Sequence, residues 1–219
     1  MRGRVRLGAY PSAAAHLFPF LFERAAQRFP GVELVPCEGS TRELEAALRH
    51  GELDLAVRPV LPIAGGDVLT CRPLWHEPLV AVVAADARPI GGVFRLADLA
   101  NRPLITVGEN TGSGPEHHQT PLAFEQAGIS PNVVFHTNRP QTMVAMVRRG
   151  IAVGVTNALD MTTANTAGVH LVPISDLPSG REVALWWRTD RTPSTAHDAV
   201  RALVAECGPP DFSGLDRSR

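Results

Sequence analysis

Hydroxyl side chains stand at two positions where an expected β-strand gives way to an expected helix. Ser12 follows the apolar run Val5–Ala9, and Ser40 and Thr41 follow a second apolar run, 31–35. In an open α/β sheet, ligands bind beyond the carboxyl ends of the parallel strands. Helix N-termini at that edge offer N–H groups and partial positive charge. These residue types at these positions therefore predict binding of a small anion rather than catalysis.

The alternative interpretation of the same hydroxyls is purely structural. Ser and Thr are common N-cap residues, and Ser12 is placed to cap the helix expected after it. Ser40 and Thr41 begin a capping box that Glu43 completes, in which cap and carboxylate bind each other's backbone N–H groups. Taken alone, the three hydroxyls leave capping and ligand binding both open.

Polar residues occupy comparable positions in the second half of the chain. Thr106 lies at the end of an expected strand, Asn138 precedes an expected helix, and Thr156 and Asn157 follow another strand. Each of them alone is typical of a turn or a helix cap. As a set that faces the hydroxyls of the first half across a cleft, they become candidate ligand contacts.

Two arginines lie close to these positions. Arg58 follows the third expected strand, and Arg139 lies near a helix start. A guanidinium at the carboxyl edge of a sheet can bind a carboxylate through two hydrogen bonds. The alternative is a solvated surface arginine, which we favour for Arg139, whereas for Arg58 both possibilities remain open.

Catalytic and metal-binding patterns are incomplete. The Gly-rich stretch 108–114 is not followed by the Gly-Lys-Ser/Thr of a phosphate-binding loop. His117 and His118 are adjacent rather than four residues apart, which is a poor spacing for one metal ion on a helix. Ser12 and His16 lack a third catalytic member, and no Gly-x-Ser-x-Gly occurs. We therefore expect no cofactor, no metal and no enzymatic activity.

The composition indicates a globular protein that does not bind DNA by itself. The chain has 219 residues, of which 44% are hydrophobic and 20% charged, with a net charge of −1. Nucleic-acid-binding domains are usually basic. The three cysteines form no C-x-x-C pair, which suits a reducing compartment. No signal sequence and no apolar run of membrane-spanning length is visible, so we expect a cytoplasmic protein without membrane contact.

Strands and helices alternate twice along the chain, over about 4–76 and about 79–176. Two apolar strands without intervening helices, 79–84 and 182–188, are the expected crossovers between the halves. This pattern predicts an α/β fold of two Rossmann-like lobes joined by two crossover strands, with a cleft between them. The expected bounds are 1–78 plus 185–219 for lobe I and 79–184 for lobe II.

A set of short motifs follows in a fixed order along nearly the whole chain. The motifs are Val5–Gly8 with Pro11–Leu17, then Phe29–Leu34, Glu38–Thr41, Leu48–Ala56, Leu96–Leu99 and Met146–Val155. In this order they resemble the effector-binding domain of LysR-type transcriptional regulators. Each motif alone is weak, but the ordered set is specific and extends from Val5 to about Glu206.

The resemblance implies a fold like that of periplasmic solute-binding proteins, with a small effector held at the hinge cleft. It also implies that the positions of Ser12, Ser40 and Thr41 face this cleft. The family consists of cytoplasmic bacterial regulators that form homodimers, and commonly tetramers. Their dimers pair the first helix of one lobe with a helix of the other lobe, antiparallel.

The regulators of this family carry an N-terminal helix-turn-helix domain and a linker helix, which this chain lacks. We therefore expect DNA binding to belong to a longer parent protein, with roughly ninety residues upstream.

The sequence thus predicts the effector-sensing domain of a LysR-type regulator, which binds a small and anionic organic molecule. One alternative is a free-standing solute-binding protein, which would need an export signal. A less favoured alternative is a small enzyme, dehydratase-like or transferase, on the same two-lobed scaffold.

Overall fold

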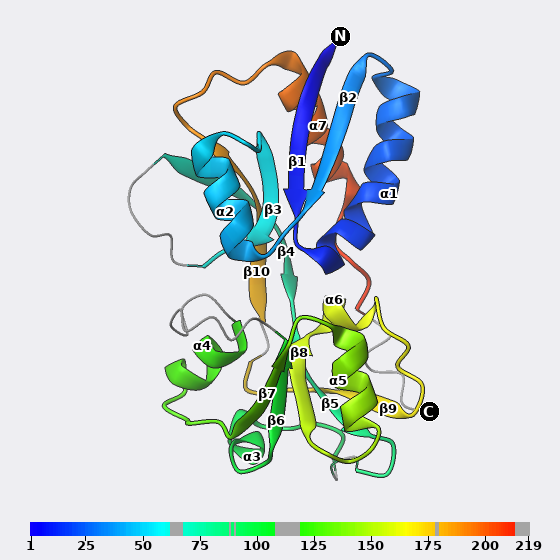
Figure 1. Ribbon diagram of the computed structural model, residues 1–219, viewed down its shortest axis with the longest axis vertical. Coiled ribbons are helices and arrows are strands. Elements are labelled where there is room, and N and C mark those ends of the chain that lie inside the picture. Colours follow the sequence, from blue (N-terminus) through cyan, green and yellow to red (C-terminus); the bar gives the residue numbers. More distant parts are fainter. Residues whose placement is uncertain (62–67, 88, 90, 108–118, 178–179, 213–219) are drawn as a thin grey trace. The chain divides into compact units, whose positions relative to one another are not determined.

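Two compact units make up the chain in the computed structural model (Figure 1), which describes residues 1–61, 68–87, 89, 91–107, 119–177 and 180–212. Unit 1 consists of Met1–His76 and Glu182–Pro210, and the body of unit 2 is Glu77–Arg181. Each unit contains one five-stranded sheet with helices packed on it. The α/β class and the division into two lobes are therefore confirmed.

The sheet of unit 1 has the strand order β2-β1-β3-β10-β4. Strand β1 pairs in parallel with both β2 and β3, whereas β10 runs antiparallel to β3. The carboxyl ends of β1, β2 and β3 therefore lie at one edge. The strands are β1 Gly3–Ala9, β2 Val32–Glu38, β3 Leu55–Pro59, β4 Leu69–Glu77 and β10 Arg181–Arg188, and the helices are α1 Pro11–Arg28, α2 Thr41–His50 and α7 Thr195–Cys207.

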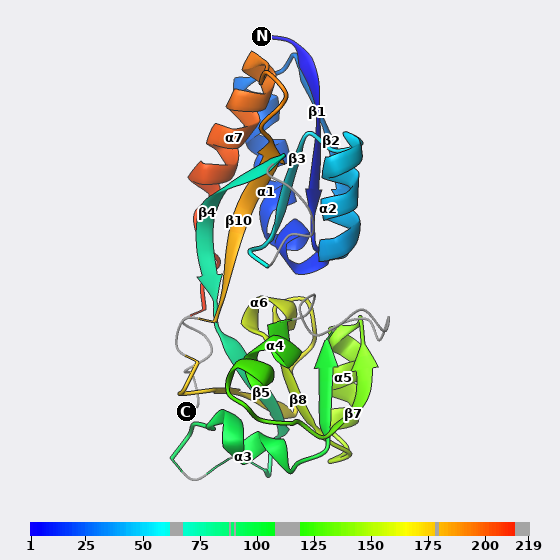
Figure 2. The same ribbon diagram turned by 90° about the vertical axis from the view of Figure 1, so that its left-hand side faces the viewer.

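Helices cover both faces of this sheet. Helices α1 and α7 pack together on one face, and α2 lies on the other (Figure 2). The inward residues of β1, Val5 and Leu7, are fully buried, as are Leu17 and Leu21 of α1. Burial of such side chains stabilises a fold by about 1.5–3 kcal/mol each, so the period of the apolar residues determines how these elements pack.

Unit 2 repeats the same arrangement, with the strand order β7-β6-β8-β5-β9. Strand β6 pairs in parallel with β7 and β8, and β5 runs antiparallel to β8. A buried apolar cluster with Phe124, Leu104 and Val155 forms one part of its core. The strands are β5 Leu79–Ala84, β6 Leu104–Val107, β7 Val133–Thr137, β8 Val153–Asn157 and β9 Val169–Pro173, and the helices are α3 Leu96–Ala100, α4 Gln119–Gln126, α5 Pro140–Val147 and α6 Ala158–Met161.

One expected crossover strand lies elsewhere. The segment 79–84 is β5, which is paired on both sides within the sheet of unit 2. The chain instead leaves unit 1 at the end of β4, between His76 and Glu77, and returns at the start of β10, between Arg181 and Glu182. A continuous apolar run is expected both for a strand buried on both faces of one sheet and for a strand that connects two lobes. The composition of 79–84 therefore did not distinguish these two possibilities.

A partly buried carboxylate fixes β1 to the start of β3 in unit 1. Asp54 accepts hydrogen bonds from the backbone N–H (2.8 Å), Nε (3.1 Å) and Nη2 (2.7 Å) of Arg6, and its own N–H donates to the Arg6 carbonyl. Burial alone would raise the pKa of Asp54, but the hydrogen bonds and the charge of Arg6 lower it below its usual value. The ionised carboxylate is thus the form that the fold stabilises.

We predict that this link makes the stability of unit 1 sensitive to acid. The pKa of Asp54 is lower in the folded chain than in the unfolded chain, where it is about 3.9. The contribution of ionised Asp54 to folding stability is therefore complete above a pH of about 3.9 and is lost as the pH falls through the pKa of the folded chain. Asp54→Asn should lower the free energy of unfolding at pH 7 by about 1–2 kcal/mol, a value reduced for the partial exposure of Arg6. Urea unfolding between pH 7 and pH 3 measures both effects.

The matched control is Glu23→Gln, which removes an exposed carboxylate from α1 of the same unit. It should leave the unfolding free energy and its pH dependence nearly unchanged. Equal acid sensitivity of Asp54→Asn and the parent chain would contradict the proposed role of Asp54.

Candidate functional site

The first two strand-to-helix turns of unit 1 are neighbours. Ala9 at the end of β1 is opposite Glu38 of β2 and Val57 of β3, and the Gly39 N–H donates to the Ala9 carbonyl at 3.3 Å. The starts of α1 and α2, which follow β1 and β2, therefore lie at the same sheet edge. This is the edge at which α/β sheets bind ligands.

Helix α1 starts two residues earlier than the sequence suggested. Tyr10 is its N-cap and makes no side-chain capping bond, Pro11 is the first helical residue, and Ser12 lies inside the first turn with 4% of its surface exposed. The expectation that Ser12 caps the helix is therefore wrong. Proline suits the first helical position because its missing N–H would have no partner there. The first turn also lacks an acidic residue, so no carboxylate of that turn offsets the positive end of this 18-residue helix.

Helix α2 begins differently, because its own carboxylate occupies its start. The Ser40 N–H donates to Glu43 Oε2 at 2.7 Å, and the Glu43 N–H donates to Ser40 Oγ at 3.3 Å. The predicted capping box is thus confirmed. Hydrogen bonds from the backbone and side chain of Ser40 lower the pKa of Glu43. Thr41, the first helical residue, is partly exposed beside this box.

Arg58 is buried inside unit 1, with 1% of its surface exposed. Its Nη2 pairs with Glu45 Oε2 of α2 at 2.8 Å, and its guanidinium carbon lies 4.7 Å from the ring centroid of Trp186. Burial lowers the pKa of Arg58, an effect that Glu45 opposes. Within the described residues, Nε and Nη1 make no hydrogen bond. The carboxylate that Arg58 binds here belongs to the protein, and the pair holds α2 on the sheet.

At the corresponding edge of unit 2, two threonine hydroxyls bind neighbouring side chains. Thr106 Oγ1 lies 2.9 Å from Nδ1 of His136 on the adjacent strand β7. Thr156 Oγ1 donates to Asp160 Oδ2 at 2.8 Å, and both residues are buried. These pairs fix the orientation of the polar side chains at the ends of β6 and β8.

The two asparagines at this edge differ in their surroundings. Asn157 is the N-cap of α6 but makes no side-chain capping bond, and 5% of its surface is exposed. Its Oδ1 is buried and has no hydrogen-bond partner among the described residues. Asn138 is exposed and precedes Arg139, the exposed N-cap of α5. Thr137 Oγ1 accepts from the Arg139 N–H at 3.1 Å, so Thr137 supports this turn.

The structure thus places the predicted residues at two edges, one in each unit. Those of unit 1 are Ser12, Ser40, Thr41 and Arg58, and those of unit 2 are Thr106, Asn138, Thr156 and Asn157. The Gly-rich stretch 108–114 and His117 and His118 lie outside the described residues. Within the described part, no cluster of three potential metal-binding side chains occurs, and no helix combines the length and apolar character needed to cross a membrane.

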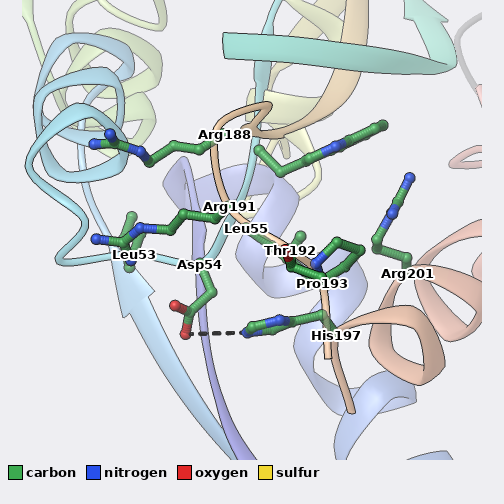
Figure 3. Close-up of a pocket in the computed structure, with 10 residues that line it drawn as sticks. Leu53, Asp54, Leu55, Arg188, Arg191, Thr192, Pro193, His197 and Arg201 are labelled. Carbon is green, nitrogen blue, oxygen red and sulfur yellow. Dashed lines mark ion pairs between the residues drawn. The ribbon is translucent and has the colours of Figure 1, made fainter. Parts of the chain in front are cut away.

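A pocket that the sequence did not predict lies at the opposite edge of unit 1, beside the amino end of β3 (Figure 3). Several basic residues between the end of β10 and the first turns of α7 contribute to it. This local run of Arg and His was the one signal in the sequence that could have indicated the pocket. Its lining consists of Leu53, Asp54, Leu55, Trp187, Arg188, Arg191, Thr192, Pro193, His197 and Arg201.

Comparisons with a family model and with known proteins indicate the same family. The model of the LysR substrate binding domain matches residues 1–208. The regulator CysB of Haemophilus influenzae is 28% identical over 166 residues, which cover 75% of this chain and 50% of CysB. The regulator TtuA of Agrobacterium vitis is 31% identical over 176 residues, 78% of this chain and 55% of TtuA. The chain therefore spans about half the length of these two relatives.

Solved structures show the same fold. The effector binding domain of QuiR in complex with shikimate has a TM-score of 0.78 at 19% identity, covering 95% of this chain and 98% of that domain. The effector binding domain of a BenM variant has a TM-score of 0.79 at 18% identity, covering 93% and 94%. At such identities the likeness concerns the fold alone.

We predict opposite stability effects at two adjacent buried residues of unit 2. Thr156→Val removes a hydrogen bond to the buried Asp160 and should lower the free energy of unfolding by about 1–3 kcal/mol. The Oδ1 atom of Asn157 has no partner in the described structure. Asn157→Leu replaces this amide with an apolar side chain of similar branching. It should leave that free energy unchanged or raise it by about 1–2 kcal/mol. Urea unfolding measures both, and an equal loss in Asn157→Leu would show that the amide oxygen is engaged.

Proposed function

We propose that this chain recognises a small organic anion and controls DNA binding in a longer protein. The basis is that the chain belongs to the LysR substrate-binding domain family. The chain is the ligand-sensing domain of a LysR-type transcriptional regulator. DNA contact is assigned to a helix-turn-helix domain of the parent protein, since the curated relatives are named as regulators of this type and are about twice as long as the matched segment.

One observation carries the assignment of an anionic effector. Helix α1 presents its N-terminus at the ligand-binding edge without a side-chain cap and without an acidic residue in its first turn. A carboxylate bound there would interact with backbone N–H groups and with the positive end of the helix dipole. QuiR, which has the same fold, was solved in complex with shikimate, a carboxylic acid; this supports the same chemical class here.

Each unit has its own set of proposed contacts. In unit 1, Ser12 and Thr41 offer hydroxyls beside the start of α1, and Ser40 shapes the neighbouring turn through its capping box. Arg58 acts through its ion pair with Glu45, which positions α2.

In unit 2, polar groups at the ends of the parallel strands form the second set of proposed contacts. The residues proposed here are Thr106, Asn138, Thr156 and Asn157. The buried amide oxygen of Asn157 is the most informative of these, because a ligand hydroxyl or amine could provide the donor that no described residue provides.

The signal would arise from a difference in affinity between two conformations of the domain. A ligand shifts a conformational equilibrium only by that difference. Binding at the proposed contacts would favour the conformation of the domain that has the higher affinity for the ligand. In the parent protein this shift would change the geometry of the DNA-binding domains.

We assign to this chain the sensing of a ligand in the cytoplasm, without chemical conversion of that ligand. The named relatives are transcriptional regulators, which favours sensing over solute transport or catalysis on the same scaffold. A regulator that acts on bacterial DNA works in the cytoplasm.

We also propose a homodimer, with tetramers in the full-length protein. Helix α1 exposes Phe22 (45%), and the edge strand β7 of unit 2 exposes Val134 (52%) and Phe135 (41%). Exposed apolar groups of this kind mark protein–protein contacts. The dimer would pair α1 of one copy with a helix of unit 2 of the other in antiparallel orientation, and we assign to this contact β7 together with the helix that follows it, α5.

We predict that a small carboxylic acid stabilises the chain and that Ser12 is needed for this. In a thermal-shift screen of shikimate and other small mono- and dicarboxylates, at least one acid should raise the Tm in proportion to the logarithm of its concentration. Ser12→Ala and Thr41→Ala should weaken binding of that acid by about tenfold each, a loss of about 1.4 kcal/mol.

Ser194→Ala is the matched control, because the Ser194 side chain caps α7 outside the proposed site. It should lower the free energy of unfolding by about 1 kcal/mol through loss of the cap and leave the Kd of the acid nearly unchanged. No stabilisation by any acid, or equal responses of all three variants and the parent chain, would refute the proposed site.

We predict that charge on the proposed dimer surface produces monomers. Phe22→Glu and Phe135→Glu should each shift the molar mass from that of a dimer toward that of a monomer in light scattering coupled to size-exclusion chromatography. Val93→Glu is the control, because Val93 is similarly exposed (44%) but lies outside α1 and β7. Dimers in both phenylalanine variants would place the interface elsewhere.

A further inference from the structure

We propose that the pocket beside the amino end of β3 in unit 1 is a second ligand site, which binds an aromatic carboxylate (Figure 3). It lies at the sheet edge opposite to Ser12 and Thr41, because Asp54 precedes β3 and Leu55 begins it, whereas the carboxyl end of this parallel strand is near Ser12 and Thr41. It is therefore distinct from the effector site proposed above and does not depend on it.

Apolar and flat groups form part of the lining. Leu53 and Leu55 contribute aliphatic surface, Pro193 contributes its ring, and Trp187 contributes a half-buried indole. Ligand pockets typically combine such surfaces with a few polar groups that orient the ligand. We assign a ring of six carbons to this pocket, since aromatic groups pack on proline and on an indole, one face of which is covered by Arg201.

Basic groups outnumber acidic groups in the same lining. Arg188, Arg191 and Arg201 carry fixed positive charge, whereas Asp54 is the single carboxylate. Asp54 is already bound by the backbone and side chain of Arg6. A ligand with negative charge would therefore be attracted, and a cationic ligand would be repelled.

The three arginines differ in how much of this charge is available. Arg188 is bound by both oxygens of Asp190, at 2.8 and 2.5 Å, and also donates to the Arg49 carbonyl. Arg191 makes no hydrogen bond or ion pair with any residue that the structure describes, and Asp190, the acid near it, is engaged by Arg188. Arg191 can therefore bind an anion without breaking an existing pair.

Arg201 is the second available cation. Its guanidinium carbon lies 3.9 Å from the ring centroid of Trp187, and its Nη1 lies 3.3 Å from Oδ1 of Asp198, whose side chain is 59% exposed. Exposed pairs of this kind contribute little. Arg191 and Arg201 lie on either side of Thr192 and Pro193, and their side chains point in different directions (Figure 3). We therefore assign the carboxylate to Arg191 and a longer-range attraction to Arg201.

Benzoate is the probe that tests this site in the intact chain. The chain has three tryptophans, and Trp75 and Trp186 are buried, with 5% and 4% of their surface exposed. In ¹H–¹⁵N spectra, titration with benzoate should shift the indole signal of Trp187 in a saturable manner, and more than the other two indole signals. Benzamide, which has the same shape without charge, should bind at least about tenfold more weakly.

Variants separate this site from non-specific attraction. Arg191→Gln combined with Arg201→Gln should weaken benzoate binding by at least about tenfold. Arg24→Gln, which removes an exposed arginine of α1, and Ser12→Ala should leave the Trp187 titration unchanged. Absence of a saturable Trp187 shift, equal binding of benzamide, or unchanged affinity in the double variant would each overturn the proposal, whatever the effector site binds.

Discussion

Parallel pairing of one central strand with two neighbours is the constraint on which each unit depends. In unit 1, β1 lies between β2 and β3, and in unit 2, β6 lies between β7 and β8. Because the three strands run in one direction, every helix that follows them starts at the same edge. The position of the proposed ligand site therefore follows from the backbone ladder, and we propose that side chains such as Ser12 and Thr41 select what binds there.

The opposite edge of unit 1 depends on the same ladder. Asp54 binds the backbone and the side chain of Arg6, so the start of β3 cannot shift along β1 without loss of several hydrogen bonds. The same carboxylate faces Nε2 of His197 at 3.8 Å, which connects the sheet to the first turn of α7. One residue thus secures the register and forms part of a pocket wall, while the carboxyl edge remains available for the effector.

Local chemistry in the sequence predicted part of this architecture. The capping box of Ser40 and Glu43 was correct, because its members are three residues apart and need no distant partner. Ser12 was wrongly expected to cap α1, because the preference of Pro11 for the first helical position outweighs that of a serine for the cap. The contacts of Arg58 with Glu45 and Trp186 join residues far apart in the sequence, and no local pattern predicts them. Helix α6 has four residues, too few for a periodic signal.

Buried polar atoms without a partner need to be interpreted by their position. Arg58 has two such nitrogens within the described structure, yet its charge is bound by Glu45 and its plane packs on Trp186, so packing inside unit 1 explains its burial. Asn157 has no comparable compensation for its Oδ1, and it stands where β8 ends. An apolar residue there would avoid the cost of a buried, unpaired amide oxygen, about 1–3 kcal/mol. We therefore propose that Asn157 is retained at this edge for contact with a ligand rather than for the stability of the fold.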